Sequence, residues 1–329
     1  MYSVSVIIPV FNVEKYIERC AVSLFEQTLS SIEYIFINDC TPDNSMEVLK
    51  KVLERYPLRA KHALIVNNEK NLGVAMSRDK GHFIAKGEYV IDCDSDDWIE
   101  PEMYEKLYRK AKLNDSDIIV CNWNNIFKKG IRAGNIDFLF SSKECIISLL
   151  NGNTPGFLWN KLIKRSLYVN YKITGVQEIN CLEDLFLLFR IFFYSKKIDY
   201  LDIRFYNYNR QNISSATYNR ISENAQSSML ALIPKVQEFF YKNQVIDSDY
   251  WLSVKNLEIR IYSIILLKGM LSESILQKCS SFKMNDIFFH PSLPLLYKFV
   301  LLLACFNFKT MLIILRYFYK KDYLTIFLR

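Results

Sequence analysis

Histidine is scarce in this sequence, and cysteine occurs without the spacing of a metal site. The three histidines, His62, His82 and His290, lie far apart, so neither a histidine-based zinc site nor a histidine-centred catalytic triad is expected. The eight cysteines include no CxxC pair. Their scatter is typical of reduced, half-buried cysteines in a cytosolic protein.

Long apolar runs are absent as well. No stretch of about 18 apolar residues occurs, so a membrane-spanning helix is not expected. The apolar run over residues 2–10 starts without a basic segment and is interrupted by Pro9, which is unlike a signal peptide. Half of the residues are apolar and 23% are charged, which excludes disordered and fibrous proteins. At about 150 residues per domain, the chain of 329 residues predicts about two domains.

The charges are divided unevenly along the chain. A net charge of +7 is too small to make nucleic acid the expected partner. Residues 1–100 contain 11 basic and 16 acidic side chains, whereas residues 201–329 contain 16 basic and 9 acidic ones. An acidic first third followed by a basic remainder requires a local explanation.

The first hundred residues alternate short β-rich runs with helical patterns. Such alternation predicts an open, mostly parallel α/β sheet, in which ligands bind beyond the carboxyl ends of the strands. Polar clusters follow these ends at Asn12, at Asn38 and Asp39, at residues 67–71 and at residues 94–97. The expected strands are residues 4–9, 34–38, 63–66 and 89–93, and the expected helices start after Asn12, at Asp43 or Asn44, and at Val74.

Further along, the sequence predicts fewer strands and then only helices. We expect a helix from Pro101, a strand over residues 117–121, a helix over residues 182–194 and a strand near residues 203–208. From Ser222 onward the pattern is helical. The expected domains are residues 1–215, with a first half 1–100 and a second half 101–215, and a helical region over residues 216–329.

The strongest chemical signal is the run DCDSDD at residues 92–97. Four carboxylates repel one another at the end of a buried strand, and a hard cation such as Mg²⁺ or Mn²⁺ would compensate their charge. Asp94 and Asp96 are two residues apart and can share one ligand field. The alternative is a solvated acidic turn in which Asp97 caps the helix that begins near Pro101.

Four segments together resemble the family 2 glycosyltransferases of the GT-A fold. They are SVIIPVFNVEKYIERCAVSLFEQTL, IEYIFINDCTPDNS, NLGVAMSRDKG and GEYVIDCDSDDWI, within the first hundred residues. The likeness extends more loosely through WNKLIKRSL and LEDLFLLFR. It implies a Rossmann-like, mostly parallel sheet flanked by helices, with a nucleotide-diphosphate sugar bound over its first half.

The resemblance also implies roles for residues of the donor half. Asp39 would accept a hydrogen bond from the base, Arg78 would supply positive charge near the diphosphate, and Gly73 would let the backbone pass closely. Asp94 would meet the ribose or the metal, and Asp96 would hold an Mn²⁺ or Mg²⁺ ion that bridges the two phosphates. The nucleotide-sugar residues implied in this way are Pro9, Val10, Asn12, Asp39, Asn71, Gly73, Arg78 and Asp94.

In the acceptor half, the resemblance points to the pair Glu183 and Asp184. Asp184 is the expected base that takes the acceptor proton, which implies displacement with inversion; both carboxylates could instead complement a helix N-terminus. Trp159 and Lys161 match the acceptor side, where Trp159 is either a stacking surface for a sugar or a core residue. The chain departs from the family pattern at Asn38, at Cys40-Thr41 and at Asp79, which leaves the identity of the donor open.

An intensely apolar segment lies near the end of the chain, over residues 293–320. If it forms one helix, its basic residues Lys298, Lys309, Arg316 and Lys320 fall on a narrow stripe, as in helices that lie in a membrane interface. The alternative is a hairpin of core helices whose lysines point to water.

The resemblance therefore implies an inverting, metal-dependent glycosyltransferase of surface polysaccharide biosynthesis. The expected donor is a UDP-sugar, and the expected acceptor is a hydroxyl of a glycan or lipid-linked molecule. The expected location is the cytoplasm, with peripheral contact to the inner face of the cell membrane through residues 293–320. A nucleotidyltransferase would need a basic, glycine-rich loop after the first strand, which PVFN does not provide. A non-catalytic binding or scaffold protein is the other alternative, against which the intact DSDD and ED segments argue.

Overall fold

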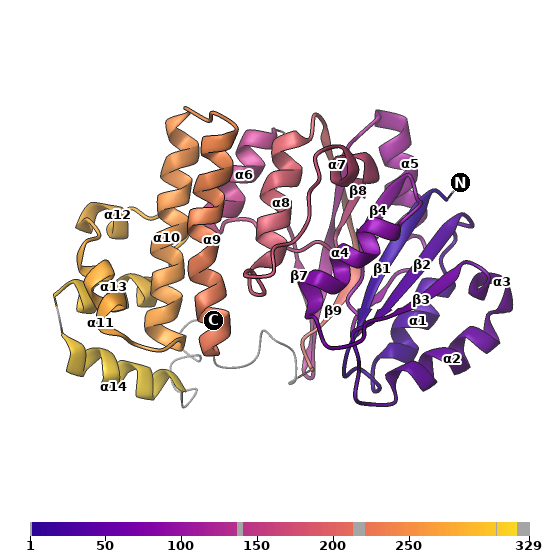
Figure 1. Ribbon diagram of the computed structural model, residues 1–329, viewed down its shortest axis with the longest axis horizontal. Helices are drawn as coiled ribbons and strands as arrows, with labels where there is room; N and C mark the ends of the chain where they lie inside the picture. The colour runs from indigo at the N-terminus through magenta and orange to yellow at the C-terminus, as the bar shows by residue number, and fades with distance from the viewer. Residues whose placement is uncertain (1, 137–140, 213–220, 307, 321–329) are drawn as a thin grey trace. The chain divides into compact units, whose positions relative to one another are not determined.

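The computed structural model describes residues 2–136, 141–212, 221–306 and 308–320 (Figure 1). The chain divides into two compact units, which we describe separately. The first comprises residues 1–145 and 155–215, and the second comprises residues 146–154 and 216–329. Residues 146–154 thus belong to the second unit. They comprise the end of the helix Ser142–Asn151 and the three residues after it.

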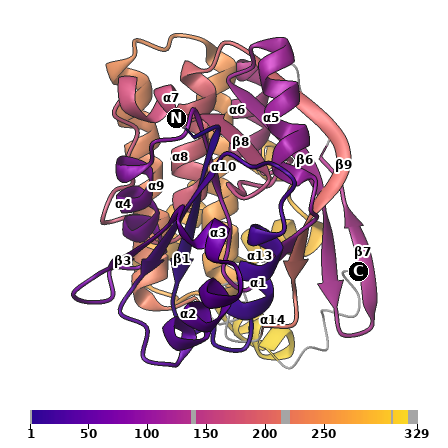
Figure 2. The same cartoon turned by 90° about the vertical axis from the view of Figure 1, so that its right-hand side faces the viewer.

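The described residues of the first unit contain one mixed sheet, in the order β3-β2-β1-β4-β8-β6-β9-β5, with β7 paired to β6. Strand β6 lies beside β7 and β9 (Figure 2). The pairs β3-β2, β2-β1 and β1-β4 are parallel, whereas β8 is antiparallel to both of its neighbours. The strands are β1 (Val4–Val10), β2 (Ile32–Asn38), β3 (Ala63–Asn67), β4 (Tyr89–Asp92), β5 (Trp98–Ile99), β6 (Ile118–Phe127), β7 (Gly130–Gly134), β8 (Lys161–Lys164) and β9 (Ile198–Asn209).

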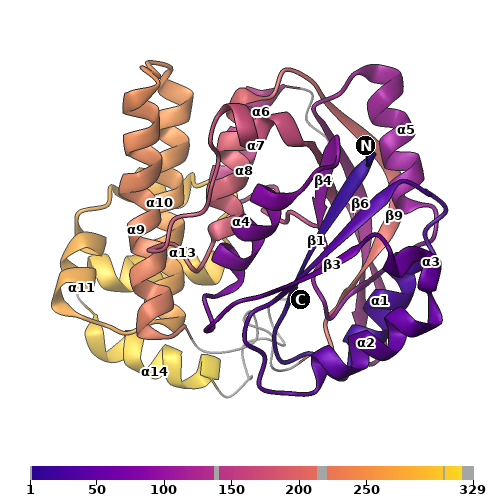
Figure 3. The ribbon, with the colours of Figure 1, turned by 45° about the vertical axis from the view of Figure 1, so that its right-hand side comes forward.

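Helices cover both faces of the first strands, with α1 and α2 on one side and α4 on the other (Figure 3). Alternate residues of β1 explain this, because Val6 and Ile8 pack in the core with α1, whereas Ile7 lies against Gly81 of α4. The helices that begin in this unit are α1 (Ile17–Phe25), α2 (Ser45–Arg55), α3 (Pro57–Ala60), α4 (Val74–Ile84), α5 (Met103–Asn114), α6 (Ser142–Asn151), α7 (Arg165–Asn170) and α8 (Glu183–Tyr194).

The strands and helices expected in the first hundred residues are all present, and the ends of the strands shift by at most two residues. The predicted strands over 117–121 and 203–208 are parts of the longer β6 and β9. The α/β class with a mostly parallel first half is therefore confirmed.

The second unit is helical in its described residues. Helices α9 (Glu223–Lys242) and α10 (Ser248–Lys268) lie antiparallel, side by side (Figure 1). They are followed by α11 (Glu273–Ser280), α12 (Met284–Phe288), α13 (Leu295–Cys305) and α14 (Lys309–Lys320). No helix in the described part of the chain has the length and hydropathy that crossing a membrane requires.

Residues 293–320 do not form the single helix on which the basic stripe depends, because α13 and α14 are separate helices. The chain turns after Cys305, where the N–H of Phe308 donates to the carbonyl of Leu303 at 2.8 Å. Arg316 is buried and donates to the carbonyl of Gly269, and Lys298 donates to the carbonyl of Phe288 at 2.6 Å. The basic residues therefore do not form one stripe along a single helix.

Candidate active site

Asp39, at the end of β2, is tied into the fold by three hydrogen bonds. Its carboxylate accepts from the N–H of Leu72 at 2.8 Å, the N–H of Gly73 at 2.9 Å and the amide of Asn68 at 2.8 Å. Gly73 has a φ of +85°, which favours glycine, and directly precedes α4. Asp39 thus fixes the start of α4, and its contact with a nucleotide base stays a prediction.

The end of β1 lies beside this turn. Pro9 is half-buried, and Asn12 is exposed with a φ of +55° and a backbone N–H that donates to the Thr41 hydroxyl at 2.8 Å. Val10 is fully buried, so its side chain packs in the core and leaves only its backbone to face a ligand. Asn71 is exposed, and its side-chain oxygen accepts from the N–H of Gly73 at 3.1 Å.

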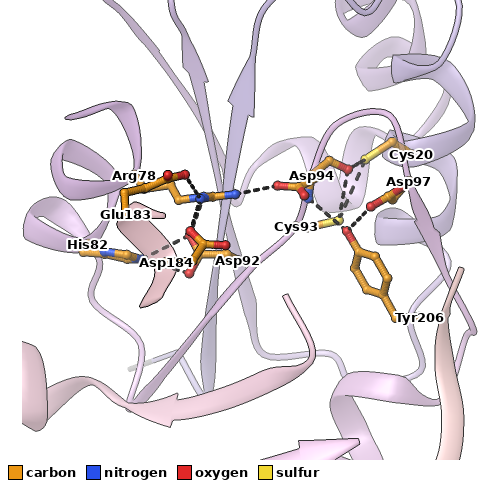
Figure 4. A network of polar contacts seen from close by, with 10 residues as sticks. All are labelled: Cys20, Arg78, His82, Asp92, Cys93, Asp94, Asp97, Glu183, Asp184 and Tyr206. Carbon is orange, nitrogen blue, oxygen red and sulfur yellow. Dashed lines mark hydrogen bonds and ion pairs between the residues drawn. The ribbon is translucent and has the colours of Figure 1, made fainter. Parts of the chain in front are cut away.

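Arg78 of α4 joins the donor-side carboxylate to the ED pair (Figure 4). Its side chain is 4% exposed. Nη2 lies 2.7 Å from Oδ1 of Asp94, while Nη1 lies 3.2 Å from Oε1 of Glu183 and contacts Oδ1 of Asp184. Carboxylates hold the guanidinium in this structure, and the role expected of Arg78 near the diphosphate stays a prediction.

This cluster contains more carboxylates than positively charged groups. Burial raises the pKa of Asp184 well above its ordinary value, although the charge of Arg78 opposes the rise. Burial likewise raises the pKa of Glu183 against the same opposing charge. Burial would lower the pKa of Arg78, but the surrounding carboxylates raise it well above its ordinary value. The carboxylates outnumber the guanidinium and are poised to accept a proton or a further cation.

Asp97 is a structural residue rather than a helix cap. Its side chain is fully buried and accepts hydrogen bonds from the Tyr206 hydroxyl and from the N–H of Asn209, both at 2.7 Å. These bonds fasten the acidic turn to β9. The interpretation of Asp97 as the cap of the following helix is therefore wrong.

Asp94 and Asp96 have the chemistry of a cation site. Burial, and after it the charge of Asp94, raises the pKa of Asp96 to about 6. Oδ2 of Asp96 accepts from the side-chain amide of Asn212 at 2.8 Å. Two carboxylates that destabilise each other's charge suit an ion with a preference for oxygen ligands, such as Mn²⁺ or Mg²⁺. No group of three or more His, Cys, Asp or Glu side chains with metal-site geometry occurs among the described residues, so diphosphate and water would have to complete the ligand set.

Trp159 and Lys161 do not face an acceptor. The Trp159 ring is 2% exposed and stacks on Phe157 on one side and on Tyr206 on the other, with centroids 4.5 and 4.1 Å away. Of the two alternatives for Trp159, the core residue is correct. Lys161 is fully buried and donates to the carbonyl of Phe157 at 2.6 Å, and burial lowers its pKa to about 8.

Sequence reasoning missed two residues of the cluster. The sequence assigns no separate role to Asp92 within the acidic run, and it shows His82 only as one of three scattered histidines. In the structure, Nε2 of His82 lies 3.2 and 3.1 Å from the two carboxylate oxygens of Asp92. The available signal was the position of His82 one helical turn after Arg78.

Comparisons with known proteins identify the family of the chain. The family model described as "Glycosyl transferase family 2" matches residues 5–171. EpsH of Bacillus subtilis is 31% identical over 254 residues, which cover 74% of this chain and 71% of that protein. The cholesterol galactosyltransferase of Borreliella burgdorferi is 30% identical, over 80% of this chain and 78% of that protein.

Two solved structures share the fold. TarS 1–349 of S. aureus in complex with UDP superposes with a TM-score of 0.67 at 18% identity, over 98% of this chain and 92% of that one. A Pyrobaculum calidifontis mannosyltransferase in complex with GDP-Man and Mn²⁺ superposes with a TM-score of 0.52 at 13% identity, over 93% and 86%. The fold is thus GT-A-like, as expected. The chain belongs to glycosyl transferase family 2 and is a nucleotide-sugar-dependent glycosyltransferase.

Proposed function

We propose that the protein is an inverting, metal-dependent enzyme that transfers a sugar from a UDP-sugar to a hydroxyl of a glycan or lipid-linked acceptor. The observation that carries the proposal is the bridge made by Arg78 between Asp94 and Asp184. It joins the residue expected at the donor to the residue expected at the acceptor. The UDP in the TarS complex supports a uridine donor.

On the donor side, Asp94 and Asp96 would hold an Mn²⁺ or Mg²⁺ ion, as their mutual repulsion favours. The ion would supply positive charge that neutralises the departing nucleotide diphosphate. The Mn²⁺ in the Pyrobaculum complex supports this choice. Asp39 would accept a hydrogen bond from the base, with Pro9, Asn12 and the Val10 backbone beside it.

On the acceptor side, Asp184 would act as the general base. A carboxylate whose pKa is raised by burial takes a proton from a hydroxyl more readily than an exposed one. The guanidinium of Arg78 would hold the carboxylate in place and stabilise its ionised form. Because the base must be unprotonated, turnover falls as the pH drops through the raised pKa of Asp184.

A panel of UDP-, GDP- and dTDP-sugars tests the donor and the metal together. With Mn²⁺, a UDP-sugar at 100 times its Kd stabilises the fold by about 2.7 kcal/mol, which raises Tm by several degrees. We expect Asp96→Asn to lose the metal-dependent part of this shift. Glu102→Gln, which changes an exposed carboxylate paired with Lys106, is the control and keeps it. If the UDP-sugar stabilises the fold equally with and without metal, the proposed metal requirement is wrong. If only a GDP- or dTDP-sugar stabilises the fold, the proposed UDP-sugar donor is wrong.

The pair of helices α13 and α14 supports contact with a membrane. Leu295 and Phe299 are exposed on α13, Phe306 is exposed directly after it, and Met311 and Ile314 are exposed on α14. Residues 295–320 contain no acidic residue, and of their basic residues Arg316 is buried, Lys298 is partly exposed and Lys309 is exposed. Exposed apolar side chains within a basic segment suit an anionic lipid surface, and the Borreliella relative is named for a lipid acceptor. We place this contact on the cytoplasmic face of the cell membrane.

Flotation with lipid vesicles checks this contact. The protein is expected to float with vesicles that contain phosphatidylglycerol and to bind phosphatidylcholine vesicles weakly, because the accessible cations Lys298 and Lys309 favour anionic headgroups. Phe299→Glu combined with Ile314→Glu should reduce binding at least tenfold. The control is Ile246→Glu in the same unit, at a side chain that is 95% exposed. Equal binding of both variants would rule out α13 and α14 as the docking surface.

A further inference from the structure

A buried acid–histidine pair lies behind Arg78, and the proposed mechanism does not use it. Asp92 is the last residue of β4 and is 1% exposed, and His82 lies on α4 and is 5% exposed. Nε2 of the histidine reaches both oxygens of the carboxylate (Figure 4). Tyr168 of α7 covers the imidazole, with ring centroids 4.5 Å apart.

Such a pair is costly for the fold. A carboxylate removed from water loses several kcal/mol of solvation, and an apolar side chain would suit the end of a buried strand better. The neighbours of Asp92 along β4, Val90 and Ile91, are buried and apolar. Because this carboxylate costs stability, we look for its role in the side chains that it contacts.

Besides His82, the carboxylate of Asp92 contacts Arg78, whose Nε lies 3.6 Å from Oδ1. Carboxylates thus surround the guanidinium on every side, with Asp92 at Nε, Asp94 at Nη2 and the ED pair at Nη1. Arg78 and His82 are four residues apart on α4, so both reach Asp92 from the same helix face. Without Asp92, the planar group could turn about its two Nη contacts.

We infer that His82 and Asp92 are positioning residues for transfer, which hold the Arg78 guanidinium in the orientation that bridges Asp94 and Asp184. The inference rests on the roles proposed for Asp94 and Asp184. His82 donates to Asp92 and fixes its oxygens, the charge of Asp92 attracts Nε of Arg78 from 3.6 Å without a hydrogen bond, and Arg78 in turn orients the carboxylate of Asp184. Neither residue of the pair touches the substrates.

Two substitutions of His82 give the sharpest test. Gln keeps an N–H donor at a similar reach, whereas Leu keeps the bulk and loses the donor. We expect His82→Leu to lower kcat at least tenfold with a donor KM within about threefold of the parent, and His82→Gln to restore most of kcat. A purely structural role predicts loss of Tm in both variants and no selective loss of kcat.

Asp92→Asn adds a readout through the pH profile. The groups that act on Asp184 are the side chains of Arg78, Asp92, Asp94, Lys161, Tyr168 and Glu183. Removing the Asp92 charge lowers the pKa of Asp184, so the acid limb of kcat moves to lower pH while kcat at its plateau falls. Glu33→Gln is the control, because Glu33 is an equally buried carboxylate, bonded to Ser5 and Lys86.

The outcomes separate the inference from the proposed function. If Asp184→Asn retains full turnover, the proposed base is wrong. If Asp184→Asn is inactive while His82→Leu and Asp92→Asn show the kcat and pH profile of the parent, the positioning role is overturned. Should Asp92→Asn fail to fold, the comparison of His82→Gln with His82→Leu decides by itself.

Discussion

Replacing Asp184 by Asn is expected to reduce kcat by about 100- to 10,000-fold, the contribution of a positioned general base. The amide has the size of the carboxylate but cannot take a proton from the acceptor hydroxyl. Binding of the nucleotide diphosphate should stay within about twofold of the parent, because Asp94 and Asp96 are untouched. Single-turnover kinetics and calorimetry with UDP and Mn²⁺ measure the two quantities.

The same variant should not lose stability at neutral or higher pH. Because burial raises the pKa of folded Asp184 above its unfolded value, the contribution of this group to stability is full below the unfolded pKa. That contribution is lost as the pH rises through the folded pKa. Asn mimics the neutral form, so the Tm of Asp184→Asn at pH 8 should equal or exceed that of the parent. Loss of turnover then cannot be attributed to unfolding.

Glu183→Gln is the matched control in the same helical turn. Glu183 also contacts Arg78, at 3.2 Å, but it is expected to support the cluster rather than to take the proton. Its loss of kcat should therefore be smaller than that of Asp184→Asn. If Glu183→Gln is the more damaged of the two variants, the base is Glu183.

Arg78→Met is expected to have the largest effect on stability. Removing one partner of a buried ion pair costs about 3–5 kcal/mol, and here Asp92, Asp94, Glu183 and Asp184 lose the same guanidinium. Urea unfolding at pH 8 should show a loss of about this size. Without the opposing charge of Arg78, the pKa values of Glu183 and Asp184 rise further in the folded state. Stability relative to the parent should therefore recover as the pH falls toward 5.5.

Arg55→Met provides the comparison for Arg78→Met. Arg55 is half exposed and pairs with Glu18 at 2.9 Å on the surface, so its removal should cost about 0–1 kcal/mol at either pH. Arg78→Lys keeps one charge but cannot make the forked contacts, and we expect intermediate stability with low turnover. A free energy of unfolding for Arg78→Met within 1 kcal/mol of the parent at pH 8 would show that Arg78 does not hold the cluster together.

Local sequence patterns were sufficient to predict the first strands and their polar ends. The runs that form β1, β2 and β4 are apolar and are followed by Asn12, Asp39 and Asp94, so their order and the edge of the site could be derived. The strand β8 was not predicted, because KLIK is short and has charged ends, and it becomes a strand by pairing with β4 and β6.

Side-chain partners were less predictable than elements. The sequence places Arg78 on the correct helix but does not predict its contact with Asp184, because Asp184 lies 106 residues further along the chain and no local pattern links the two. The sequence also leaves open whether Trp159 is a core residue or a sugar-stacking surface, since its two stacking neighbours, Phe157 and Tyr206, come from different segments. The break after Cys305 falls at FNFKT, where Asn307, Lys309 and Thr310 interrupt the apolar run, and extending the helical periodicity through these residues misses it.

The pairing of β4 with β8 has a consequence for how the chain can fold during synthesis. The strands β1 to β4 are complete at residue 92, but the free edge of β4 is covered only when residues 161–164 emerge. Until then β4, whose side chains are buried in the folded protein, exposes unpaired backbone N–H and C=O groups along one edge. An exposed strand edge of this kind favours aggregation. The guanidinium of Arg78 meets two of its carboxylate partners even later, when Glu183 and Asp184 have been synthesised. We therefore expect residues 1–100 alone not to persist as a stable monomer, and the nascent sheet to depend on protection until α8 has left the ribosome.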